Sequence, residues 1–216
     1  MFFHGFAVFS VCGEAAWKDE SMTQMKTFYT SERSEWRAWL AVNFEREPEI
    51  WLVFPMKAAE EPRLSYNDAV EEALCFGWID TTICNLDALH RAQRFCPRRK
   101  GSPYSRANIE RLIWLESREM LHPAVRESVL EVIRTPYAFP EDILQALRQE
   151  PEAWENYEQF PEAYRRIRVA YIDAARKRPE EFRRRLESFL RKTKENKLFS
   201  GYGGIDKYYH EDAEKM

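Results

Sequence analysis

The sequence has little of what marks nucleotide-binding enzymes or membrane proteins. Its 216 residues include only seven glycines, and neither a P-loop nor a Gly-x-Gly-x-x-Gly pattern occurs among them. No apolar run approaches the roughly 18 residues that a membrane-spanning helix needs. The net charge is −3, so the chain as a whole lacks the excess of positive charge that is typical of proteins that bind polyanions. We therefore expect no membrane span and no common phosphate loop.

Cysteine and histidine are also scarce and scattered. Zinc sites usually begin with two ligands two to four residues apart, and the cysteines are Cys12, Cys75, Cys84 and Cys96. Free thiols suit a reducing compartment, which favours a cytoplasmic location. None of the histidines stands in a recognisable nucleophile-and-base motif; they are His4, His90, His122 and His210. We predict no metal, no cofactor and no catalytic residue, and favour a protein that is not an enzyme.

The N-terminal run MFFHGFAVFSVCGEAA superficially resembles a signal peptide. It lacks a basic start, and Glu14 and the charged run 18–20 fit that pattern poorly. A more ordinary sequence begins at Met25. We expect residues 1–25 to be a disordered or non-structural extension.

The next hundred residues alternate between helical and strand-type segments. Serine caps and apolar periodicity predict helices that begin after Ser31 and Ser65 and end near Phe44 and Gly77. Apolar and β-branched residues predict strands at 50–54, 78–83 and 91–96, the last two forming a hairpin. This order predicts an α-β-α-β-β unit with a small antiparallel sheet.

The second half is helical by pattern, with prolines between the expected helices. The last helix has an apolar stripe at the spacing of one helix face, formed by Phe182, Leu186, Phe189 and Leu190. Strands followed by helices predict an α+β fold rather than a wound parallel sheet. We divide the chain into an α+β domain at 26–120, a helical domain or subdomain at 121–198, and a flexible tail at 199–216.

A basic cluster lies between Asp87 and Glu110. It holds no acidic residue and six basic ones, Arg91, Arg94, Arg98, Arg99, Lys100 and Arg106. It leads into a predicted helix start capped by Ser102 or Ser105, where backbone N–H groups and the helix dipole favour an anion. Just before the cluster, Trp78 and Asp80 share one face of a strand.

We predict that these features form a pocket for a small anionic or phosphorylated ligand. In this hypothesis Arg98 binds the charged group of the ligand, and Ser105 and nearby N–H groups donate hydrogen bonds to it. Asp80 orients Arg98, and Trp78 forms a wall of the pocket. The predicted lining is Trp78, Asp80, Arg94, Arg98, Ser105 and Asn108.

Three alternatives remain open at this point. Asp80 could be the acid or base of an uncharacterised enzyme. The same residues could be purely architectural, with Asp80 holding Arg98. A second basic cluster at 165–197 has thirteen basic and five acidic residues, 13 − 5 = +8, and could contact a protein or a nucleic acid. It has no aromatic interleaving on its polar face, which argues against nucleic acid. The oligomeric state is not indicated.

The motifs of residues 66–108 resemble a known bacterial family. They include the run Tyr66 to Asp80, which ends in ALCFGWID, and the run Arg94-Phe95-Cys96-Pro97-Arg98. Weaker matches follow at Leu144–Leu147 and at Lys177-Arg178-Pro179-Glu180. Together they resemble the YdeI/OmpD-associated, or bacteriocin-protection, proteins. The resemblance implies a cytosolic bacterial protein with a role in envelope or bacteriocin stress tolerance, and it implies no reaction.

Overall fold

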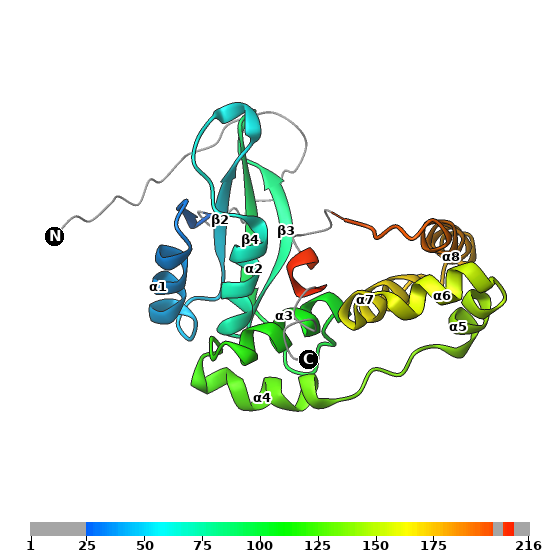
Figure 1. The fold of residues 1–216 in the computed structure, drawn as a ribbon. Coiled ribbons are helices and arrows are strands. Elements are labelled where there is room, and N and C mark those ends of the chain that lie inside the picture. The colour runs from blue at the N-terminus through cyan, green and yellow to red at the C-terminus, as the bar shows by residue number, and fades with distance from the viewer. Residues whose placement is uncertain (1–24, 201–204, 210–216) are drawn as a thin grey trace. The chain divides into compact units, whose positions relative to one another are not determined.

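The computed structural model describes residues 25–200 and 205–209. Most of the predicted extension at 1–25 and of the predicted tail at 199–216 therefore lies outside the described residues. A small sheet in the first half and helices in the second confirm the α+β fold (Figure 1). The described chain forms two compact units. The first contains the residues up to Ser102 together with Leu121–Val125, and the second contains Pro103–Met120 and the residues from Arg126 on.

A four-stranded sheet of order β1-β2-β4-β3 is the centre of the first unit. Its strands are β1 (Thr27–Tyr29), β2 (Ile50–Pro55), β3 (Trp78–Asn85) and β4 (His90–Pro97). The predicted hairpin is β3 and β4, and β4 also pairs antiparallel with β2. β1 runs parallel to β2 and makes the sheet mixed. β1 was not predicted, because three residues are too few to show a strand period.

Two helices, α1 (Arg33–Asn43) and α2 (Tyr66–Cys75), cover one face of this sheet (Figure 1). Trp36 of α1 is fully buried, lies edge-on to Phe95 of β4 at 5.4 Å, and donates its indole N–H to the carbonyl of Ala69 at 3.0 Å. Ser65 caps α2 as predicted, since its Oγ accepts from the N–H of Asp68. Ser31 does not cap α1. The cap position is Glu32, whose N–H donates to the hydroxyl of Thr30 instead.

A buried network of charges joins the two helices. Glu71 and Glu72 of α2 are at most 1% exposed. Glu72 accepts from Arg33 and from Arg37, each at 2.6 Å, and Arg33 also reaches Asp68 at 2.7 Å. Because buried carboxylates are costly without such partners, the network ties α2 to α1 at a defined register.

Removal of one carboxylate charge from this network should destabilise the protein strongly. Glu72→Gln leaves the partner arginines with uncompensated charge, so we expect a loss of about 3 kcal/mol or more in the free energy of unfolding. Urea titration followed by circular dichroism measures it. Glu47→Gln is the control, because it removes the more exposed ion pair of Glu47 with Lys26 and should cost less than about 1 kcal/mol. Equal losses in the two variants would contradict the role assigned to the network.

Gly77 ends α2 and turns the chain into β3, as the sequence predicted. Its φ of +72° lies in the left-handed region. Its N–H donates to the carbonyl of Leu74, and its own carbonyl accepts from the N–H of Arg98 at 2.9 Å. A β-carbon here would lie 3.4 Å from the methyl groups of Val125.

We expect Gly77→Ala to lower stability by about 1–2 kcal/mol, because a non-glycine residue is strained at this φ. Thermal unfolding measures it. Gly101→Ala is a matched variant, since φ is +80° there but the added carbon would contact nothing within 4 Å. Comparable losses would assign the cost to backbone strain. A gain in stability for Gly77→Ala would rule the strain out.

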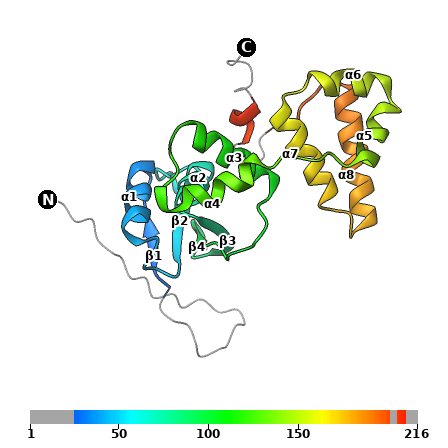
Figure 2. The ribbon, with the colours of Figure 1, turned by 90° about the horizontal axis from the view of Figure 1, so that it is seen from below.

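The second unit is built from helices. α4 (Pro123–Arg134) begins in the first unit and continues in this one. The others are α3 (Arg106–Ser117), α5 (Glu141–Arg148), α6 (Pro151–Gln159), α7 (Glu162–Asp173), α8 (Pro179–Lys194) and the short η2 (Ile205–Tyr209). The predicted stripe of α8 faces the core of this unit, with Phe189 buried and Phe182, Leu186 and Leu190 packed against it. Figure 2 shows α5, α6 and α8 side by side, and contacts join α6 to both.

Candidate functional site

Trp78 belongs to the core and not to the wall of a pocket. Its side chain is 1% exposed, and its indole N–H donates to the carbonyl of Phe44 at 3.0 Å. Its ring lies edge-on to Trp39 at 5.8 Å. The architectural reading of this residue is therefore the one that the structure supports.

Asp80 and Arg94 point to opposite faces of the sheet. Asp80 pairs with Phe95 across the hairpin and accepts a 2.6 Å hydrogen bond from the hydroxyl of Tyr66 on α2. Arg94 precedes Phe95 and so points the other way, where it donates to Glu49 at 2.5 and 2.8 Å. Asp80 orients a tyrosine rather than an arginine.

Arg98, Ser105 and Asn108 each make local contacts within their own unit. The guanidinium of Arg98 donates to the carbonyl of Ser102 at 2.8 Å. Ser105 caps α3 by accepting from the N–H of Asn108, whose side chain accepts from Arg111. Ser105 and Asn108 also belong to the second unit, whereas the other four belong to the first. Within neither unit are the predicted residues gathered into one site.

A cleft of about 590 Å³ lies elsewhere in the first unit, at the uncovered part of the sheet beyond the start of α2. Its floor comes from β2, β4 and β3, where Phe54 pairs with Arg91 and Ile83 pairs with Gln93. Its wall is the connection from β2 to α2, which includes η1 (Lys57–Ala59). The lining is Phe54, Pro55, Met56, Lys57, Arg63, Leu64, Ser65, Tyr66, Ile83, Arg91 and Gln93. We call it the basic cleft.

The charges that line the basic cleft are all positive. Lys57, Arg63 and Arg91 contribute side chains, and no carboxylate is among the lining residues. Lys57 and Arg91 make no ion pair with any residue that the structure describes, and Arg63 makes a long 3.4 Å hydrogen bond to the carbonyl of Pro55. The N-terminus of α2, at Ser65 and Tyr66, adds the positive end of a helix dipole. Together these groups favour a bound anion.

The sequence placed Arg91 in a basic cluster but did not connect it with Lys57 and Arg63. Those two residues lie in the loop after β2, and only the pairing of β2 with β4 brings them to Arg91. The sequence does not show which strands are neighbours in the sheet, and so it could not predict this register.

His90 joins the hairpin turn to the wall of the basic cleft. Its Nδ1 lies 2.9 Å from the Asp87 carboxylate, and its Nε2 lies 3.2 Å from Glu61 in the connection to α2. Beside it, the N–H of Met56 donates to the carbonyl of Leu89 at 2.7 Å. The hydrogen bond to Asp87, with that to Glu61, raises the pKa of His90 above its ordinary value of 6.5.

This raised pKa predicts a pH dependence of stability. The contribution of protonated His90 is fully present below pH 6.5, its unfolded value, and is lost as the pH rises through the raised folded value. We therefore expect the melting temperature of the wild type to fall more than that of His90→Gln between pH 6 and pH 9. The difference should be small, because the pair is exposed. If the melting temperatures of the two proteins change with pH in parallel, the hydrogen bonds of His90 to Asp87 and Glu61 do not contribute to stability.

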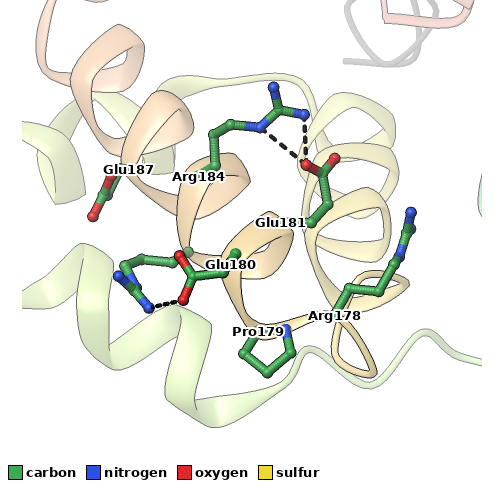
Figure 3. A pocket seen from close by; sticks show the side chains of 7 residues that line it. Arg178, Pro179, Glu180, Glu181, Arg184 and Glu187 are labelled. Carbon is green, nitrogen blue, oxygen red and sulfur yellow. Dashed lines mark hydrogen bonds and ion pairs between the residues drawn. The ribbon is translucent and has the colours of Figure 1, made fainter.

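The second predicted basic region, 165–197, is partly compensated, because seven of its thirteen basic residues pair with carboxylates. At the start of α8, Arg183 pairs with Glu180 at 2.7 Å. Arg184 pairs with Glu181 (Figure 3), and Arg185 pairs with the same carboxylate. The shallow hollow there is lined by three arginines, three glutamates and a proline. Arginines and glutamates are therefore equal in number in this hollow.

Two classes of feature are absent from the described residues. No group of three or more His, Cys, Asp or Glu side chains there could hold a metal ion. No helix in that part of the chain is both long and apolar enough to cross a membrane. Cys75, Cys84 and Cys96 are free thiols, and burial is the main reason that the pKa of Cys75 is raised to about 12.

Comparison with protein families gives two matches along the chain. Residues 136–196 match the family described as "Bacteriocin-protection, YdeI or OmpD-Associated". The resemblance to that family is confirmed over these residues. The match covers α5 to α8, in the second unit. Residues 28–128, which include ALCFGWID, match a model described as a domain of unknown function (DUF8412). No curated protein and no solved structure matches the chain.

Proposed function

We propose that this bacteriocin-protection-associated protein is a non-enzymatic binding protein that takes a small anionic or phosphorylated ligand into the basic cleft. The observation that carries the proposal is the convergence of Lys57, Arg63 and Arg91 on one concave site without a lining carboxylate. This site replaces the one expected around Arg98, whose guanidinium is engaged by the Ser102 carbonyl.

The physical case rests on charge and shape. Three cations that line one cleft repel one another, and an anion held between them removes that repulsion. Arginine also binds phosphate and carboxylate groups through two parallel hydrogen bonds, which fixes their orientation. The cleft volume is in the range of small-molecule sites, and Phe54, Leu64 and Ile83 give it an apolar lining.

Anions should raise the melting temperature of the protein through this cleft. A ligand at a hundredfold excess over its dissociation constant stabilises the folded state by about 2.7 kcal/mol. We expect inorganic phosphate or a sugar phosphate to shift the melting temperature of the wild type. Arg91→Ala should weaken the affinity by about tenfold or more, because it removes a charge-assisted contact. A thermal-shift titration measures both.

Arg99→Ala is the matched control for this experiment. Arg99 is exposed in the same unit, does not line the cleft, and its replacement changes the net charge by the same amount. The control should respond to anions as the wild type does. If Arg91→Ala and Arg99→Ala both keep the wild-type response, or if no anion stabilises the wild type, the cleft is not the binding site.

A further inference from the structure

Gln93 places a side-chain amide at the floor of the basic cleft. It lies on β4 between Leu52 and Ile83, and only 7% of the residue is exposed. Its side chain lines the cleft but has no hydrogen-bond partner among the described residues. This amide can therefore donate to and accept from a group that enters the cleft.

The register of the sheet fixes what surrounds this amide. Arg91 lies two residues before Gln93 on the same face of β4, which places the two about 7 Å apart along the strand. Phe54 is the strand neighbour of Arg91, and Ile83 is that of Gln93. The floor thus presents a cation and, one step along, an amide that can both donate and accept, each beside an apolar side chain.

We propose that the ligand of the basic cleft is an organic phosphate that carries a hydroxyl or amide group, and that Gln93 selects it. This inference rests on the proposed function. The phosphate lies at Arg91 with Lys57 and Arg63, and the ligand body extends along β4 so that its polar group pairs with the Gln93 amide. Inorganic phosphate or an alkyl phosphate satisfies the cations but leaves Gln93 unpaired. A site built to hydrogen-bond a ligand group discriminates against analogues that lack it.

Two probes that share a phosphate and a five-carbon body separate these contributions. Ribose 5-phosphate carries hydroxyl groups, and pentyl phosphate does not. We expect the full-length wild type to bind ribose 5-phosphate about tenfold tighter than pentyl phosphate in isothermal titration calorimetry. Gln93→Leu keeps the approximate size of the side chain but removes its amide. It should remove this preference while changing the affinity for pentyl phosphate less than about twofold. Arg91→Ala should weaken both probes alike.

The outcomes distinguish the two proposals. If both probes bind the wild type equally, or if Gln93→Leu weakens both to the same extent, Gln93 does not select the ligand although the cleft still binds phosphate. If neither probe nor inorganic phosphate binds the wild type, the proposed function itself fails, and this inference with it. Gln93→Met serves as a second variant, so that a folding defect in Gln93→Leu, seen by circular dichroism, does not decide the result.

Discussion

The buried ion network between α1 and α2 is the constraint on which the first unit depends. Glu71 and Glu72 are buried side by side on α2, in a helix whose other buried residues are mostly apolar. Arg33 and Arg37 on α1 reach them and form the ion pairs that offset the cost of their burial. An apolar contact tolerates small slips, whereas this network requires one register. Because α2 begins at Tyr66 and is followed by Gly77, that register also positions a wall of the basic cleft and the start of the hairpin.

The hairpin of β3 and β4 connects the end of α2 to the sheet. The carbonyl of Gly77 accepts from the N–H of Arg98, which closes the open end of β3 and β4. From there the pairing of β4 with β2 decides which side chains face the helices and which face away. Arg91 and Gln93 fall on the helix-covered side, beyond the reach of α2, and Arg94 falls on the other. A slip of one residue would exchange these roles, so the composition of the cleft follows directly from the strand register.

Local signals in the sequence were sufficient for much of this fold and insufficient for the site. The cap at Ser65, the stop at Gly77 and the apolar stripe of α8 depend on neighbours within one or two turns, and the structure confirms them. β1 was missed because its pairing, rather than its composition, makes it a strand. The predicted site residues of the first unit are not gathered together for a related reason. Trp78, Asp80 and Arg94 are close in sequence or across the hairpin, yet the face that each occupies is decided by pairing and packing.

Charge pairing then separates the structural arginines from the candidates for binding. Arg33, Arg37 and Arg94 in the first unit, and Arg106 and Arg166 around the buried Glu110 in the second, each contact a carboxylate at 2.5–2.9 Å. Arg183, Arg184 and Arg185 are likewise paired within α8, inside the segment that carries the family match. A count of basic residues therefore overstates the positive field that a partner meets at 165–197. In the basic cleft the opposite holds, because Lys57 and Arg91 face a site without a lining carboxylate. Anion affinity should follow cations that share one concave site without a carboxylate rather than the densest basic run, which is why the smaller cluster in the first unit is the better candidate.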